Sequence, residues 1–435
     1  MHHHRRPSNL LFDASLRPGN AAFAILILLL FLVFLLLFMT FIAPPAQAQT
    51  YKVIYNFTGG GDGATPWAGV TLDKAGNLYG TTYYGGGGPC NDGYGIRCGT
   101  VFQLAHNRSG WTFNPLYEFT GNNDGAYPAA SVIFGPDGTL YGTTSGGIGY
   151  GTVFNLRPSG PPCRSALCPG TESVLYRFAG GIFGEFPFLG DLVFDQAGNL
   201  YGTTIEGGSN GQGVVYELSP SAGGWTESVL YNMNAGTSGN FPYSGVIFDS
   251  AGNLYGTATM GGAYNYGAVY QLTPSGTGWT ENTIYSFQGA GDGKIPIGGL
   301  IIDSLDNLYG TTAAVPGATV FELTPSNATW TFKVLYTFSA NPNQGPDDGP
   351  NDRLFMDAAG NLYGTAYGEG AYSRGSVFKL TPSAGGWTFT GLHDFSGSDG
   401  AYPIGGVVQD TDGNIYGTTS GGGAFGNGVV FEITP

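Results

Sequence analysis

The chain contains few charged residues, and basic ones are the rarer kind. Asp, Glu, Lys and Arg together make up 10% of the 435 residues, and only five lysines occur. Residues 49–435 hold 12 basic and 29 acidic side chains, a net charge of −17. Nucleic-acid binding requires a basic stripe, and anionic lipid attracts basic segments. The composition therefore argues against both partners for this part of the chain.

Histidine is also rare. Three of the five histidines are His2, His3 and His4, and the others are His106 and His393. The chain therefore has few histidines from which a catalytic triad or a histidine–metal site could be built, and neither a G-x-S-x-G elbow nor a P-loop occurs. His393 replaces a tyrosine that other repeats carry, which predicts a packing role. We assign no catalytic residue and expect no cofactor.

Glycine is abundant, which argues against helices. The chain has 77 glycines, about 18% against a usual ~7%. Each glycine inside a helix costs roughly 0.5–1 kcal/mol relative to alanine. No Gly-X-Y period occurs, so collagen is excluded, and 42% hydrophobic residues are too many for a disordered chain. A large, turn-rich, all-β protein remains.

Residues 1–48 are typical of an export leader. Arg5, Arg6 and Arg17 precede the apolar run 21–43, and Ala46-Gln47-Ala48 follows it. A positive start, an apolar run and an A-x-A site describe a signal peptide cleaved after Ala48. As a helix the run would span ~35 Å, enough for a retained membrane anchor. In both cases residues 49–435 are expected outside the cytoplasm: secreted, periplasmic or on the cell surface.

The rest of the chain repeats one unit seven times. The pattern Asn-Leu-Tyr-Gly-Thr recurs every 53–62 residues, with its tyrosines at Tyr79, Tyr141, Tyr201, Tyr255, Tyr309, Tyr363 and Tyr416. Three more short runs of alternating apolar and polar residues surround each tyrosine, and Gly, Asp, Asn and Pro separate the runs. Four strands per unit predict a β-propeller. Residues 49–435 are thus predicted to form seven blades of four antiparallel strands.

The two ends of this region are incomplete blades. Residues 51–57 resemble the fourth run of a unit, and residues 429–433 resemble the third. Pairing of Tyr51–Phe57 with Gly428–Ile433 would complete the seventh blade and remove two exposed sheet edges.

The repeated N-L-Y-G-T-T, G-x-V-F-x-L and G-W-T elements resemble those of the GloVer tandem-repeat proteins, the choice-of-anchor group, over residues 51–435. The resemblance implies an exported bacterial protein and carries no activity or catalytic residue. Members often end in an anchoring tail, which the pattern lacks after Thr434-Pro435. Surface attachment would then depend on retention of residues 21–43.

All four cysteines lie in the two longest units. Cys90 and Cys98 form one close pair, and Cys163 and Cys168 form another. In an exported chain this spacing predicts two local disulfides. Metal binding is the weaker interpretation, because no histidine accompanies them.

Propeller geometry places the fourth-to-first and second-to-third loops of every blade on one face, which we call the loop face. We predict ligand-binding residues there: Asp62, Asp124, Asp292, Asp348, Asp399, Trp67, Tyr127 and Tyr402. Carboxylates among exposed aromatics suit sugar recognition, or a hard cation such as Ca²⁺. The alternative is turn chemistry, because Asp-Gly is a common turn dipeptide.

Three functions remain open. The sequence favours a binding module for a glycan or a cell-surface protein. A carbohydrate-active hydrolase or lyase would need a carboxylate pair that departs from the repeat, for which the irregular residues Glu185, Glu206, Glu369 and Arg374 are candidates. The third function is a structural surface repeat without a ligand.

Overall fold

The computed structural model describes residues 49–435 except 89, 91–96, 109, 159–169, 237, 277, 315–316, 328 and 339–348. The chain divides after Ala48. The leader predicted for residues 1–48 lies outside the described residues, as do Asp348, Cys163 and Cys168. Among the described residues, no helix combines the length and apolar character needed to span a membrane.

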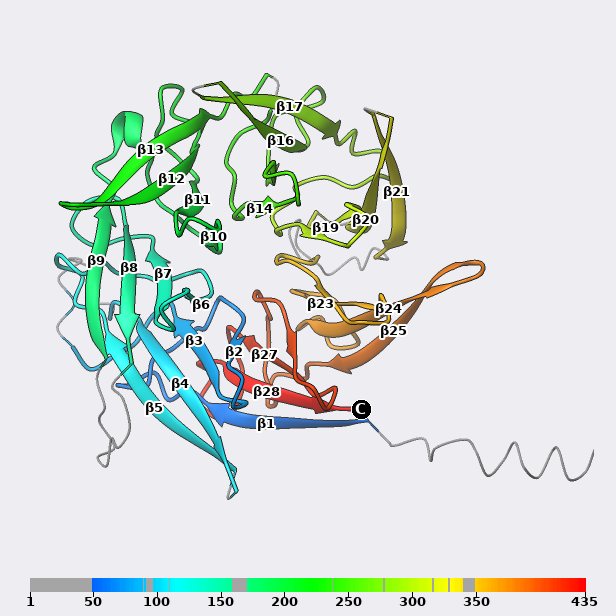
Figure 1. Ribbon diagram of the computed structural model, residues 1–435. Helices are drawn as coiled ribbons and strands as arrows, with labels where there is room; N and C mark the ends of the chain where they lie inside the picture. Colours follow the sequence, from blue (N-terminus) through cyan, green and yellow to red (C-terminus); the bar gives the residue numbers. More distant parts are fainter. Residues whose placement is uncertain are drawn as a thin grey trace, which may run out of the picture. The chain divides into compact units, whose positions relative to one another are not determined.

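The described residues form seven four-stranded antiparallel sheets around a common centre, a seven-bladed β-propeller (Figure 1). We number the blades by their innermost strands, which are β2 (Thr71–Leu72), β6 (Ile133–Phe134), β10 (Val193–Phe194), β14 (Ile247–Phe248), β18 (Ile301–Ile302), β22 (Phe355–Met356) and β26 (Val408–Gln409). The second strands are β3 (Leu78–Thr82), β7 (Leu140–Thr144), β11 (Leu200–Thr204), β15 (Leu254–Ala258), β19 (Leu308–Thr312), β23 (Leu362–Ala366) and β27 (Ile415–Thr419).

The outer half of each blade is a longer hairpin. The third strands are β4 (Thr100–Asn107), β8 (Thr152–Arg157), β12 (Val214–Ser221), β16 (Ala268–Ser275), β20 (Thr319–Ser326), β24 (Ser376–Ser383) and β28 (Val429–Thr434). The outermost strands are β5 (Gly110–Glu118), β9 (Thr171–Arg177), β13 (Gly224–Asn232), β17 (Gly278–Ser286), β21 (Thr329–Thr337), β25 (Gly386–Asp394) and β1 (Thr50–Asn56). The three-residue 3₁₀ turn η1 (Gly181–Phe183) lies between blades 2 and 3.

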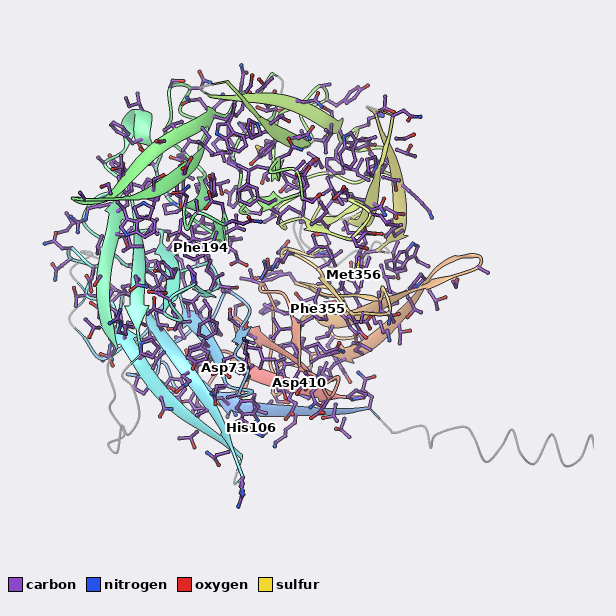
Figure 2. The ribbon with its side chains drawn as sticks, viewed as in Figure 1. Asp73, His106, Phe194, Phe355, Met356 and Asp410 are labelled. Atoms are coloured by element: carbon purple, nitrogen blue, oxygen red, sulfur yellow. A yellow bond between two sulfur atoms is a disulfide. The ribbon has the colours of Figure 1, made fainter. Side chains whose placement is uncertain are left out.

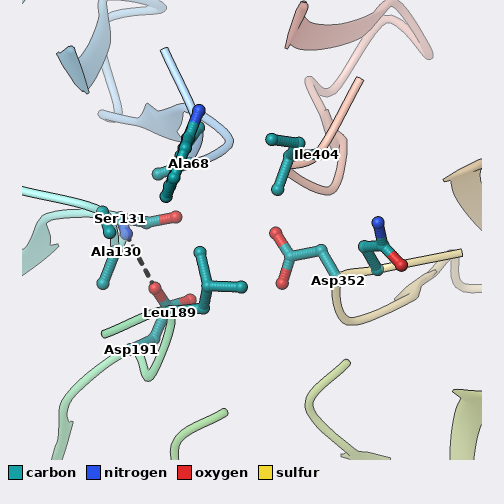
Figure 3. A pocket seen from close by; sticks show the side chains of 10 residues that line it. Ala68, Ala130, Ser131, Leu189, Asp191, Asp352 and Ile404 are labelled. Atoms are coloured by element: carbon teal, nitrogen blue, oxygen red, sulfur yellow. Dashed lines mark hydrogen bonds between the residues drawn. The ribbon is translucent and has the colours of Figure 1, made fainter. Parts of the chain in front are cut away.

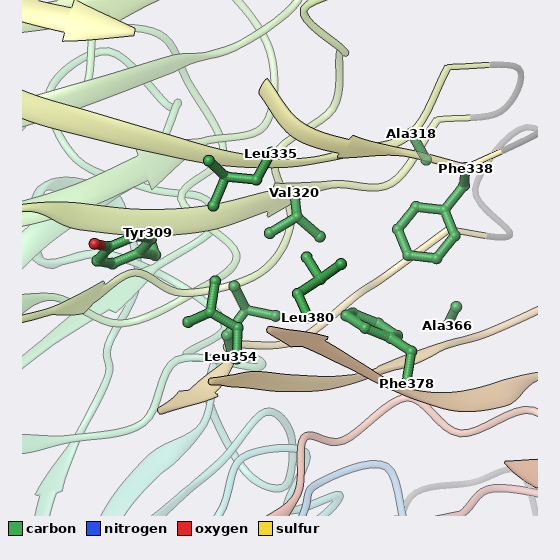
Figure 4. Close-up of a cluster of buried hydrophobic side chains, with 10 residues drawn as sticks. Tyr309, Ala318, Val320, Leu335, Phe338, Leu354, Ala366, Phe378 and Leu380 are labelled. Atoms are coloured by element: carbon green, nitrogen blue, oxygen red, sulfur yellow. The ribbon is translucent and has the colours of Figure 1, made fainter. Parts of the chain in front are cut away.

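The repeated Leu-Tyr-Gly-Thr segment is the second strand and is buried along its whole length. Its glycine is required by packing. A Cβ on Gly310 would lie 2.5 Å from the ring of Phe321 on the neighbouring third strand. The hydrophobic core consists of separate clusters at the interfaces between neighbouring blades. Figure 4 shows the cluster in which Val320 and Phe338 of blade 5 pack with Leu354 and Phe378 of blade 6.

The turn between the first and second strands explains why the tyrosine follows a fixed Asp. Oδ1 of Asp249 accepts hydrogen bonds from the backbone N–H groups of Ala251 and Asn253, and Oδ2 accepts from the Tyr255 hydroxyl at 2.9 Å. Burial raises the pKa of Asp249, but these hydrogen bonds outweigh it and hold the pKa below its usual value. The equivalent residues Asp73 and Asp410 are labelled in Figure 2.

The predicted closure of the ring is confirmed. Strand β1 pairs antiparallel with β28, from Thr50 opposite Thr434 to Asn56 opposite Val429, and the N–H of Phe57 continues the pairing by donating to the Gly428 carbonyl. The first described strand thus supplies the outer edge of the blade that the last three strands begin.

Of the two predicted disulfides, the one between Cys90 and Cys98 is present, with a Cα–Cα distance of 5.4 Å. Both cysteines lie between β3 and β4.

Candidate functional site

The predicted loop aspartates accept hydrogen bonds within their own blades. Oδ2 of Asp62 accepts from the Tyr55 hydroxyl at 3.0 Å and from the Thr58 N–H at 2.8 Å. The same arrangement recurs at Asp124 and Asp292. At Asp399 a histidine replaces the tyrosine, and the Ser396 N–H donates to Oδ1. These carboxylates therefore hold each loop against the outer strand, which by itself accounts for their recurrence. Their role toward a ligand stays a prediction.

At Asp399 the hydrogen-bond partner is His393, which takes the place of the repeated tyrosine. Its Nε2 lies 2.9 Å from Asp399 Oδ2, and its ring stacks on Tyr51 at 3.6 Å between centroids. These contacts describe a packing residue between blades 6 and 7.

The predicted aromatic residues are partly brought together. Trp67 stacks on Tyr83 at 3.9 Å, and Tyr83 stacks on Tyr127 at 5.2 Å. Phe188 touches Trp67 edge-on at 5.5 Å and Tyr243 at 5.8 Å. These five residues, which we call the aromatic group, come from blades 1 to 4 and are all partly exposed.

The remaining predicted aromatic residue, Tyr402, belongs to a different contact. It lies 5.1 Å from Tyr367, between blades 6 and 7.

Short segments just before the innermost strands line the central channel, and we call them the neck segments. Most carry Gly, Ala or Ser because neighbouring blades approach backbone to backbone there. A Cβ on Gly69 would lie 2.7 Å from the Gly406 carbonyl oxygen, and one on Gly245 would lie 2.1 Å from the Asp191 carbonyl oxygen. Figure 3 shows this part of the channel.

Two neck segments do not follow this pattern of small residues, and neither was predicted from the sequence. The neck segment of blade 1 runs from Pro66 to Val70, and that of blade 3 runs from Pro187 to Leu192. The segment of blade 3 is therefore one residue longer, and the additional residue accommodates Asp191. Blade 6 places Asp352-Arg353 where most other blades carry small residues. Comparing the seven neck segments position by position would have revealed these single-copy differences.

Asp191, Asp352 and Arg353 form a group that we call the channel charge group. Arg353 Nη2 lies 3.3 Å from Asp191 Oδ2, which links blades 6 and 3. Asp191 Oδ1 accepts from the Ser131 N–H at 2.9 Å, as the dashed line in Figure 3 marks. Asp352 accepts from the N–H of Arg353 at 2.7 Å and from that of Gly406 at 2.6 Å. The group therefore ties together blades 2, 3, 6 and 7.

Two hollows meet at this group. One is lined by Trp67, Ser131, Asn351 and Ile404 among others. The second lies along the innermost strands and has Arg353 in its wall together with aliphatic residues: Leu192, Val193, Val246, Ile247 and Leu300. Leu189, Asp191 and Asp352 line both hollows, so the charge group lies where they join.

The channel charge group is enclosed but reached by solvent. The Arg353 side chain is 46% exposed, and that of Asp191 is 14% exposed. Burial raises the pKa of the Asp352 carboxyl to about 6, and the nearby Asp191 carboxylate adds to the rise, while Arg353 opposes it. The two aspartates are therefore a carboxylate pair with one member partly protonated near pH 6.

The four irregular residues of the hydrolase interpretation lie elsewhere. The backbones of Glu185 and Glu206 bond to each other, and Glu185 Oε1 accepts from the Gly181 N–H at 2.8 Å. Glu369 lines an outer hollow with Tyr336 and Asp394. Neither channel hollow includes any of the four. Over the described ranges, no cluster of three or more His, Cys, Asp or Glu side chains could hold a metal ion.

The repeats match a known family. Residues 40–187, 149–347 and 316–435 match the model described as the Gloeobacter/Verrucomicrobia repeat. This agrees with the resemblance seen in the sequence. A comparison with curated proteins found no matching sequence.

Similar solved structures include a protein proposed to be a 6-phosphogluconolactonase from Bacteroides fragilis, at 15% identity and a TM-score of 0.49, covering 76% of this chain and 85% of that one. Another is the soluble aldose sugar dehydrogenase from Escherichia coli, at 12% identity and a TM-score of 0.42, covering 89% and 100%. These values are too low to support an argument about activity.

Proposed function

This chain belongs to the Gloeobacter/Verrucomicrobia repeat family, and from the site that its repeats build we propose that it is an exported glycan-binding module. The ligand would lie at the mouth of the channel, over the aromatic group. The disulfide between Cys90 and Cys98 supports an oxidising, extracytoplasmic location.

The observation that carries the proposal is the position of the aromatic group. Trp67 both stacks in that group and lines the hollow that Asp191 and Asp352 share. Partly exposed aromatic faces beside a few fixed polar groups are typical of ligand sites, and they match the apolar faces and hydroxyl edges of sugar rings. The loop aspartates would extend this surface, and Ca²⁺ would bind there if the interaction requires a cation.

Substitution of Trp67 tests the proposal. We expect the full-length chain to bind specific glycans on an array, and Trp67→Ala to weaken that binding about tenfold, because a stacking surface is lost. Trp225→Ala on the outer strand β13 is the matched control and should keep the affinity. Running the array with and without a chelator tests Ca²⁺. If no glycan binds, or if both variants bind alike, the proposal is wrong.

A carbohydrate-active hydrolase or lyase is the second candidate, and the Asp191–Asp352 pair favours it. A carboxyl group with a raised pKa beside a second carboxyl group is the arrangement that acid–base catalysis on sugars uses. Release of shortened products from a bound glycan would support this candidate, whereas saturable binding without turnover supports the binding module.

A further inference from the structure

The structure also bears on the charge of the ligand. We propose that the glycan carries carboxylate groups and that Arg353 binds one of them inside the channel. This inference rests on the proposed function, because it names the ligand class of the same site.

Arg353 is the only basic residue among the described residues that line the two channel hollows. It lies on a neck segment where other blades carry small residues, and it is one of only 12 basic residues after residue 48. Its position is therefore a single-copy departure from the repeat, whose other neck segments carry no basic residue.

The guanidinium of Arg353 has unused hydrogen-bonding capacity. An arginine carries five N–H donors in a planar fork. Within the described part of the chain, the ion pair of this side chain is the contact of Nη2 with Asp191 at 3.3 Å, and the nearby Asp352 carboxyl also interacts with its charge. Because 46% of the side chain is exposed, the other donors remain available to a molecule in the channel.

The two aspartates, by contrast, already have donors. Each oxygen of Asp191 and Asp352 accepts a hydrogen bond or pairs with Arg353, and three of these donors are backbone N–H groups. The aspartates therefore hold the arginine in place, and the remaining N–H groups of its exposed guanidinium are the donors left for a ligand. The arginine fork matches the two oxygens of a carboxylate.

A glycan at the channel mouth could reach this fork. Trp67 lines the hollow that contains Asp191 and Asp352, and the adjoining hollow contains Arg353. The net charge of −17 for residues 49–435 opposes an anion at long range. At 0.15 M salt, however, charges more than about 8 Å apart are largely screened, so the contact inside the channel decides.

The test compares acidic probes with their own uncharged esters. Oligomers of galacturonate, glucuronate, mannuronate and guluronate, each beside its methyl ester, would be titrated into the full-length chain by calorimetry. We expect at least one acid to bind about tenfold or more tightly than its ester, the effect of one charge-assisted contact. Arg353→Gln should remove this preference, and Lys333→Gln, which changes the net charge equally on the exposed face of β21, should keep it.

A second variant guards against misfolding. Arg353→Gln leaves Asp191 without its partner, so Arg353→Gln/Asp191→Asn restores the charge balance and should lose the same preference. If esters bind as tightly as acids, or if the double variant keeps the preference, the inference is wrong. Trp67-dependent binding of neutral glycans alone would overturn the inference and leave the proposed function standing. Failure of every glycan, acidic or neutral, would overturn both.

Discussion

The tyrosine of an outermost strand meets one of two kinds of side chain from the next blade. Between blades 4 and 5, Tyr285 stacks on Phe332 at 4.0 Å. Between blades 2 and 3 the partner is a carboxyl, because the Tyr176 hydroxyl donates to Glu227 Oε2 at 3.3 Å. Burial raises the pKa of Glu227 to about 7. The stacked interface is insensitive to pH, whereas the glutamate interface is not.

Substitution of Glu227 should reveal this difference. The pKa rises from 4.5 to about 7 on folding, so the folded state binds more protons between these pH values. The contribution of Glu227 to stability is then fully present below pH 4.5 and is lost as the pH rises through 7. We expect Glu227→Gln to gain, relative to wild type, on the order of 1 kcal/mol in unfolding free energy between pH 5 and pH 8, allowing for partial exposure.

Urea unfolding at the two pH values measures this gain. Asp412→Asn, on an exposed turn, is the control and should show the same difference from wild type at both. An equal effect of Glu227→Gln at pH 5 and pH 8 would contradict the prediction.

At the level of the strand, a threonine near the end of the second strand joins successive blades. Thr418 of β27 donates to the Ala68 carbonyl of the next neck segment at 2.7 Å, and Thr365 donates to the Gly405 carbonyl at 3.0 Å. Thr143 of β7 faces the longer neck segment of blade 3. Its buried hydroxyl has no hydrogen-bond partner among the residues that the structure describes. The inserted residue that accommodates Asp191 thus costs blade 2 a hydrogen bond.

Two identical substitutions measure that cost. Thr418→Val removes a buried hydrogen bond and leaves the Ala68 carbonyl without this donor, so we expect a loss of about 1–2 kcal/mol in unfolding free energy. Thr143→Val removes a hydroxyl without a partner and should be neutral or slightly stabilising. Chemical denaturation of both variants measures the two changes in unfolding free energy. Equal losses would show that the Thr143 hydroxyl is hydrogen-bonded after all.

The strands were more predictable than the site. Leu254-Tyr255-Gly256 recurs with the same alternation in every unit, so period and spacing were enough to predict four strands per blade and the closure by β1. The channel charge group depends on which segments turn inward, and on a one-residue insertion before Asp191 that a repeat pattern averages away. The contact between Trp67 and Phe188 joins loops of different blades, which strand periodicity does not describe.

At the scale of the ring, the interface between the closing blade and blade 1 has the same packing as the interface between blades 1 and 2. Phe57 follows β1 as Phe119 follows β5, and both side chains are at most 2% exposed. Phe57 packs edge-on against Phe102 at 5.2 Å, and Phe119 packs against Phe154 at 5.2 Å. The closing blade is therefore built as firmly as an internal one.

Matched core deletions test that equivalence. We expect Phe57→Ala and Phe119→Ala each to lower the unfolding free energy by about 3–5 kcal/mol, the usual loss for a buried phenylalanine. Both variants should unfold in one transition, as calorimetry can show. A much smaller loss for Phe57→Ala would mean that the N-terminal strand is a loosely attached tail.

A ring latched by its two ends has a consequence for how it is made. Strand β1 is synthesised before its partner β28, so it cannot pair until β28 has been made. Until the two strands pair, blade 7 has an open edge with which the β1 strand of another copy could pair. Two chains that meet before closure could swap their β1 strands and form a domain-swapped dimer. Dilution during refolding should therefore favour the singly closed ring over interlinked copies.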